Sequence, residues 1–177
     1  DQCAGRIPVF IHVGAMKTKD ACELAGHARE IGADGIGAVS PAFYGATEVS
    51  IYDYYAAIAR SVPEDFPVYL YNIPQCSAND LPVAVADRLA GEFPNIVGIK
   101  YSFADMCRTL EYQKVNDGEF SVLHGCDKLI NVLMAMGCDG VVSGVSSVYP
   151  ELFVDVYQAC MKGEWEEVIN KDPAANE

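Results

Sequence analysis

The sequence predicts a parallel α/β fold built from about six strand–helix units. Short apolar runs alternate along the whole chain with segments whose apolar residues recur at helical spacing. The same order of glycine, turn and strand entry occurs at 32–36 and again at 137–141, which indicates an internal repeat. The chain has 177 residues, 51% of them hydrophobic, and no linker-like stretch. We therefore expect one domain over 1–171 and a frayed tail at 172–177.

Three units are expected in the N-terminal half, with strands at 7–13, 36–39 and 68–71. The candidate N-caps of the helices that follow are Thr18 or Asp20, then Thr47, then Asn79 or Asp80. The apolar stripes expected to face the sheet are Ala21, Leu24, Ala25, Ala28 and Ile31; then Ile51, Tyr54, Tyr55, Ile58 and Val62; then Leu81, Val85 and Leu89. Gly32 is expected to end the first helix.

Three more units follow, with strands expected at 96–100, 120–124 and 141–143. Asp105 and Asp127 are the candidate N-caps of the fourth and fifth helices, and Pro150 is expected to start the sixth. Their apolar stripes are Met106, Leu110 and Val115; Leu129, Ile130, Leu133 and Met134; and Leu152, Phe153, Val156, Tyr157 and Cys160. One or two further helical turns are expected at 165–171.

Six units fit two architectures. An open doubly wound sheet commonly has a G-x-G-x-x-G turn after its first strand, but the first strand here is followed by Gly14-Ala15-Met16-Lys17. A closed (β/α)₈ barrel has two more units, roughly 60 residues more than this chain provides. The strand–helix pattern alone leaves both architectures open.

Composition excludes several classes of function. The formal net charge of −13 disfavours nucleic-acid binding, because an acidic surface repels phosphates. No apolar run is long enough to span a bilayer, and the first residues resemble no secretory signal. The seven cysteines are scattered without zinc-site spacing, which suits free thiols in a reducing cytoplasm and predicts no metal. The three histidines, His12, His27 and His124, are expected to be structural.

The candidate chemistry lies at the carboxyl ends of neighbouring strands, where parallel α/β folds place their active sites. Lys100 is expected to end the fourth strand, Tyr71 the third and Ser143 the sixth. A lysine amine can form a Schiff base with a carbonyl compound, and a phenol beside it can transfer protons. Strict alternation would place Lys100 on the same face as Gly98 and Ile96. The alternatives are a solvated lysine, a core tyrosine and a small residue suited to a crowded strand end. Cys76 and Cys126 near this rim are expected to be inert.

Two motifs carry a resemblance to a known family. Tyr71-Asn72-Ile73-Pro74 and Gly98-Ile99-Lys100 resemble the Y-N-x-P and G-x-K signatures of the dihydrodipicolinate synthase and N-acetylneuraminate lyase family. Supporting segments occur in the matching order at 6–14, 32–41, 94–100, 124–127 and 140–143. The resemblance covers about residues 6–170 and aligns them with strands three to eight of the family's barrel.

This resemblance implies a TIM (β/α)₈ barrel, here six of its eight units, and a lyase or aldolase of the Schiff-base type. Lys100 would bind pyruvate or a related 2-oxo acid covalently, and Tyr71 would transfer protons. The expected substrate-binding residues are Ser102, Gly125, Asp127, Val142, Ser143 and Tyr44, with Phe43 as the alternative to Tyr44 at the mouth. The resemblance implies no cofactor or metal, no nucleic-acid or membrane partner, and a cytoplasmic homo-oligomer, either a dimer or a tetramer.

Some residues depart from the family pattern. Cys76 replaces the arginine that synthase members carry, which argues against aspartate semialdehyde, and Lys128 replaces an acidic residue typical of sialic acid lyases. The family's carboxylate-binding G-T-T-G-E-type loop has no match. We therefore expect an open barrel with exposed apolar edges that binds 2-oxo acids poorly by itself. The alternatives are an inactive fragment, a non-catalytic or regulatory 2-oxo-acid-binding paralogue, and a phosphate-binding barrel that uses residues 144–147 as its anion loop.

Overall fold

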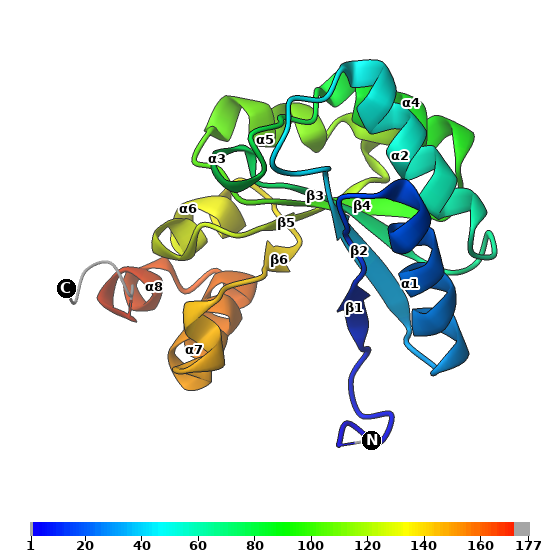
Figure 1. The fold of residues 1–177 in the computed structure, drawn as a ribbon. Coiled ribbons are helices and arrows are strands. Elements are labelled where there is room, and N and C mark those ends of the chain that lie inside the picture. The colour runs from blue at the N-terminus through cyan, green and yellow to red at the C-terminus, as the bar shows by residue number, and fades with distance from the viewer. Residues whose placement is uncertain (1, 172–177) are drawn as a thin grey trace.

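The computed structural model describes residues 2–171 as one curled parallel sheet with helices on its outer side (Figure 1). The expected tail at 172–177 lies outside the described residues. Strands pair in sequence order from the first to the sixth, each with the next. The strands are β1 (Phe10–His12), β2 (Gly35–Val39), β3 (Val68–Asn72), β4 (Ile96–Tyr101), β5 (Ser121–His124) and β6 (Gly140–Val141). Within the described residues β1 and β6 each have one strand neighbour, which confirms the predicted open barrel.

Helices follow the strands as the repeat predicts. They are α1 (Thr18–Glu30), α2 (Glu48–Arg60), α3 (Pro74–Ser77), α4 (Val83–Glu92), α5 (Met106–Tyr112), α6 (Ile130–Ala135), α7 (Pro150–Lys162) and α8 (Trp165–Lys171). Short 3₁₀ turns lie at Val115–Gly118, Asp127–Leu129 and Val145–Ser147. The sequence analysis did not predict α3. Gly32 follows α1 with φ of 81°, the left-handed conformation expected of a helix-ending glycine.

The two edge strands are shorter than predicted. The strand expected at 7–13 spans only Phe10–His12, since Pro8 has no amide proton to donate and β2 begins opposite Phe10, at Gly35. The strand expected at 141–143 ends at Val141, so Ser143 lies in the following loop rather than at a strand end. Both differences fall where a neighbouring strand is present on one side only.

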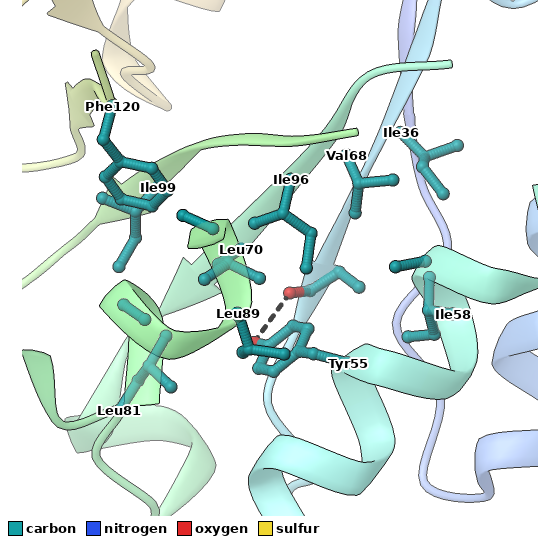
Figure 2. Packing of buried hydrophobic residues seen from close by; sticks show 14 of the residues in the cluster. Ile36, Tyr55, Ile58, Val68, Leu70, Leu81, Leu89, Ile96, Ile99 and Phe120 are labelled. Carbon is teal, nitrogen blue, oxygen red and sulfur yellow. Dashed lines mark hydrogen bonds between the residues drawn. The ribbon is translucent and has the colours of Figure 1, made fainter. Parts of the chain in front are cut away.

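The main core lies between the sheet and the helices α2 and α4. Figure 2 shows Ile36, Val68, Leu70 and Ile96 from the strands meeting Tyr55 and other helix side chains. The hydroxyl of Tyr55 is fully buried and donates to the carbonyl of Ala38 at 3.0 Å and of Tyr71 at 3.3 Å. This core therefore ties the ends of β2 and β3 to α2.

Three predicted core residues are exposed instead. Leu24 is 45% exposed, Ile31 59% and Leu110 45%. In α1 the buried stripe consists only of alanines, at 21, 25 and 28. Small side chains let a helix lie close to the sheet, so larger residues beside that stripe are left outside the contact. The stripe predicted for α2 is buried throughout.

A local irregularity in β4 changes which side chains share a face. Val68 pairs with Ile96, but the next residue of β3, Tyr69, pairs with Gly98, so the register shifts by one residue. As a result Ile96 packs in the helix-facing core (Figure 2), whereas Lys100 lies on the concave face. The expectation that Ile96 shares the face of Lys100 is wrong, because an extra residue resets the two-residue alternation.

The helix caps are confirmed in two cases and wrong in three. Thr47 and Asp105 accept hydrogen bonds from the amides of Ser50 and Arg108. The helices α1, α4 and α6 instead have N-cap residues that form no side-chain cap bond, namely Lys17, Pro82 and Leu129. Of the residues expected to cap them, Thr18 and Asp20 lie inside α1, Asn79 and Asp80 lie in the loop before α4, and Asp127 lies in the 3₁₀ turn before α6.

We expect Thr47→Ala to lower the free energy of unfolding by about 1 kcal/mol, because the amide of Ser50 loses its acceptor. Thr18→Ala is the matched control: Thr18 lies in the first turn of α1 and forms no cap. The control should change the free energy by less than about 0.5 kcal/mol. Urea unfolding followed by circular dichroism measures both, and equal losses in the two variants would contradict the assigned cap.

Candidate active site

A cavity of about 470 Å³ opens on the concave face of the sheet. Most of its lining is apolar or aromatic, with one cationic group. The lining residues are Pro8, Phe10, Ile11, His12, Gly37, Tyr69, Leu70, Tyr71, Lys100, Leu123 and Val142. A concave, mostly apolar pocket with a few polar groups is the usual form of a small-molecule site.

Lys100 and Tyr71 are adjacent in this cavity. They are register partners on β4 and β3, and Lys100 Nζ lies 4.1 Å from the centre of the Tyr71 ring. Within residues 2–171 no carboxylate forms an ion pair with Lys100, and the Tyr71 ring can stabilise its charge through a cation–π contact. The sequence placed these residues at two neighbouring strand ends, and the structure brings their side chains together. Each lies one residue before the last of its strand.

Gly98 makes the room that this arrangement needs. A Cβ atom built on Gly98 would lie 2.6 Å from the Tyr69 ring and 2.4 Å from the carbonyl oxygen of Ser121. The ring of Tyr69 therefore occupies the space beside Gly98, two residues before Lys100. Phe10 packs edge-on against Tyr69 with ring centres 5.6 Å apart. This aromatic layer forms the floor beneath Lys100 and Tyr71.

Ser102 and Gly125 stand on the other side of Lys100. A Cβ atom on Gly125 would lie 2.0 Å from Ser102 Oγ and 3.3 Å from Lys100 Cε, so these three residues are in close contact. Ser102 is buried, and its Oγ has no hydrogen-bond partner among the described residues. A buried hydroxyl without a partner beside a candidate nucleophile is available to a ligand.

The loops after β3 and β4 are held by polar side chains that the sequence analysis did not single out. Asn72 Nδ2 donates to Asp80 Oδ1 at 2.8 Å and to the Tyr112 hydroxyl at 3.0 Å. The carbonyl of Asn72 accepts from the amide of Ser102, and Gln75 Nε2 donates to the carbonyl of Ser102 at 2.6 Å. The conformation after Lys100 is therefore fixed from β3 and α3. The sequence signal for these loop contacts is that two amide side chains, Asn72 and Gln75, occur at and just after the end of one strand.

Of the remaining predicted substrate-binding residues, Asp127, Ser143 and Tyr44 are not among the residues that line the cavity. Val142 lines the cavity. Asp127 Oδ2 accepts from the amide of Val145 at 3.4 Å, and its buried Oδ1 has no partner in the described part of the chain. Ser143 Oγ accepts from the amide of Ser146 at 3.0 Å. Tyr44 does not line the cavity, and its hydroxyl donates to the carbonyl of Met16.

His12 lines the cavity, although the sequence analysis expected this histidine to have only a structural role. Its ring lies perpendicular to the Tyr71 ring, with centres 6.1 Å apart. His12 is exposed on β1, but partial desolvation of its ring and, to a smaller extent, the positive charge of Lys100 lower the pKa of His12 from its usual 6.5, which favours the neutral ring. The sequence signal for this position is the spacing of two residues between Phe10 and His12, because residues two apart on a strand share a face.

His124, by contrast, is buried in the protein interior. Its Nδ1 accepts from the amide of Cys126, and burial lowers its pKa to about 4. Across residues 2–171 the structure gathers no cluster of three His, Cys, Asp or Glu side chains able to hold a metal ion. None of the helices in the described part of the chain is long and apolar enough to cross a membrane.

Comparison with known proteins agrees with this geometry. The model of the dihydrodipicolinate synthetase family matches residues 1–173. The chain belongs to this family. It is 35% identical over 164 residues to the 4-hydroxy-tetrahydrodipicolinate synthase of Aquifex aeolicus, covering 93% of this chain and 55% of that protein. It is 39% identical to the probable 2-dehydro-3-deoxy-D-pentonate aldolase YjhH of Escherichia coli, covering 90% of this chain and 54% of that protein.

Solved structures of the family share the fold. YagE, a prophage protein of Escherichia coli K12 solved in complex with pyruvate, superposes with a TM-score of 0.90 at 29% identity. The match covers 97% of this chain and 58% of YagE. The chain thus spans little more than half the length of its relatives, and its six strands correspond to part of a dihydrodipicolinate synthetase family barrel.

Proposed function

We propose that this chain carries the catalytic pair of a lyase or aldolase that forms a lysine Schiff base with pyruvate or a related 2-oxo acid. The observation that carries the proposal is the contact between Lys100 Nζ and the Tyr71 ring at 4.1 Å in a mostly apolar cavity. Membership of the dihydrodipicolinate synthetase family and the pyruvate bound to YagE support the substrate class.

Lys100 supplies the nucleophile of the proposed reaction, and Tyr71 transfers its protons. The neutral amine of Lys100 adds to the C2 carbonyl of the 2-oxo acid and gives a carbinolamine. Tyr71 donates a proton to the hydroxyl group that leaves as water, and an iminium remains on Lys100. The Tyr71 phenolate left by that step then takes a proton from C3, which gives an enamine. The enamine forms a carbon–carbon bond with the carbonyl carbon of an aldehyde, whose oxygen takes the proton from Tyr71. Water then hydrolyses the iminium and frees Lys100, and the reverse sequence breaks the carbon–carbon bond.

The second substrate is best assigned to an aldehyde that yields a small sugar acid. Cys76 is exposed where synthases carry arginine, so a charged partner for a second carboxylate is missing at that position. The 39% identity to an Escherichia coli protein named as a probable 2-dehydro-3-deoxy-D-pentonate aldolase also supports a sugar-acid substrate. Ser102 and Gly125 beside Lys100 would then contact the 2-oxo acid, and Val142, with Asp127 and Ser143 in the neighbouring loops, would meet the longer sugar chain.

The phosphate-binding alternative is disfavoured by the loop at 144–147. The amides of Val145 and Ser146 already donate to Asp127 and Ser143, and the amide of Ser147 to a backbone carbonyl. The Asp127 carboxylate would repel a phosphate at this place. The non-catalytic paralogue remains the second candidate, and the same experiment separates it from the enzyme.

Borohydride trapping with pyruvate tests the proposal. The reagent reduces an imine to a stable secondary amine, and peptide mass spectrometry then identifies the modified lysine. We expect the adduct on the peptide that contains Lys100, with the other lysines as internal controls. The 177-residue chain should trap weakly, and a longer form with two further βα units from the Aquifex aeolicus relative should trap strongly. Absence of an adduct from both forms would reject the enzyme in favour of the non-catalytic paralogue.

A further inference from the structure

We propose that His12 is a positioning residue that holds the Tyr71 ring in place beside Lys100. This inference rests on the proposed Schiff-base chemistry and deepens it, since it assigns the orientation of the proton-transferring phenol to a side chain on a different strand. The imidazole of His12 comes from β1, the phenol of Tyr71 from β3 and the amine of Lys100 from β4. All three residues line the same cavity.

The strand register brings His12 and Tyr71 together across β2. His12 is the register partner of Gly37, and Gly37 is followed on the same face by Val39, the partner of Tyr71. Gly37 presents no side chain between the two rings. The imidazole therefore reaches over β2 and meets the Tyr71 ring at right angles, with centres 6.1 Å apart. A perpendicular arrangement at this separation is a favoured aromatic contact.

The imidazole is itself restrained on two sides. His12 Nε2 accepts a hydrogen bond from the amide of Val39 at 3.1 Å. A Cβ atom on Gly14 would lie 2.8 Å from His12 Cε1, so the backbone after β1 passes tightly over the ring. A ring fixed by one hydrogen bond and one backbone contact can restrict the motion of the ring that it touches. Lys100 then lies over the Tyr71 ring with its Nζ 4.1 Å away.

The hydrogen bond from Val39 requires the neutral form of His12. A protonated imidazole has hydrogens on both nitrogens and cannot accept from an amide. The titratable groups that share its cavity are Tyr69 and Tyr71 on β3 and Lys100 on β4. Charge on His12 would add a second cation beside Lys100, and this repulsion together with burial lowers the pKa of His12. The positioning contact is therefore present above that pKa and lost as the pH falls through it.

Three variants of the longer form, the one with two further βα units, test the positioning role of His12. His12→Gln keeps an acceptor at the place of Nε2, His12→Phe keeps a ring but has no acceptor, and His12→Ala removes both. The measured rate is the exchange of pyruvate C3 hydrogens for deuterium, followed by NMR in D₂O at saturating pyruvate. We expect about a tenfold loss in the Ala variant and a loss of about threefold in the Phe and Gln variants, because Phe keeps the ring without its anchor and Gln keeps the acceptor without the ring. Because Tyr71 also donates the proton that releases water, trapping at Lys100 should be slower in the variants, but its final yield and the KM for pyruvate should equal those of the wild type.

The pH dependence separates positioning from a purely structural role. Below pH 6.5 the exchange rate of the wild type should fall more steeply than that of His12→Gln, because both proteins lose the neutral amine of Lys100 but only the wild type loses the acceptor for the Val39 amide. Equal exchange rates in His12→Phe and the wild type, or the same acid loss in His12→Gln, would overturn the inference. Failure of the wild type to trap pyruvate would instead reject the proposed function. Thermal unfolding of each variant verifies that the compared proteins are folded.

Discussion

Lys100→Arg is expected to eliminate the borohydride-trapped pyruvate adduct and to slow deuterium exchange at pyruvate C3 by roughly 10⁴-fold or more. A guanidinium remains protonated at any accessible pH and has no lone pair to add to a carbonyl. The substitution keeps a positive charge over the Tyr71 ring, where Lys100 Nζ now lies at 4.1 Å. It therefore removes the nucleophile and leaves the charge largely in place.

The readouts for this variant are the mass of the Lys100 peptide and the NMR exchange rate, both in the longer form. Lys128→Arg is the matched control, because it is the same chemical change at the lysine next to Asp127. The control should retain both the adduct and exchange within about threefold of the wild type. A full yield of adduct in Lys100→Arg would show that another amine is the nucleophile, and the assignment of the site would be wrong.

Gly98→Ala is expected to lower the free energy of unfolding by about 3 kcal/mol or more. The new methyl group would lie 2.4 Å from the carbonyl oxygen of Ser121 and 2.6 Å from the ring of Tyr69. The ring can turn away, but the carbonyl belongs to the neighbouring strand β5 and moves only if the pairing of β4 with β5 is disturbed. Because the clashing atom belongs to the backbone, relieving the clash lowers the free energy of unfolding more than moving a side chain would.

Gly26→Ala is the same chemical change with the opposite expected sign. Gly26 lies inside α1, and a Cβ atom there meets nothing within 4 Å outside its own helix. Alanine should stabilise the protein by about 0.5–1 kcal/mol, because it lowers the backbone entropy of the unfolded chain. Urea unfolding of both variants measures the contrast. A Gly98→Ala variant as stable as the wild type would mean that the floor of the cavity is loosely packed.

The order of strands and helices was determined by the sequence, since it depends on local spacing. Apolar runs of three to seven residues predicted all six strands, and helical stripes such as that of α2 predicted the buried faces. The same local patterns placed Lys100 and Tyr71 near the ends of adjacent strands. In a parallel sheet those ends lie at one edge, so their contact followed from the order of the units.

Other features were decided by the tertiary structure. Caps depend on where the chain enters a helix: Thr47 occupies that position, whereas Asn79 instead donates to the carbonyls of Pro41 and Tyr44 and holds their loop. The face of Ile96 depends on a register shift that no pattern within one strand reveals.

The contact between His12 and Tyr71 joins residues 59 positions apart across β2, which contributes Gly37 opposite His12 and the Val39 amide that donates to the imidazole. Pairs of this kind come together only when the sheet curls, because curvature turns separate strand positions toward one cavity. The sequence therefore determined which residues we propose to react, and the packing of the curled sheet determined which side chains lie against them.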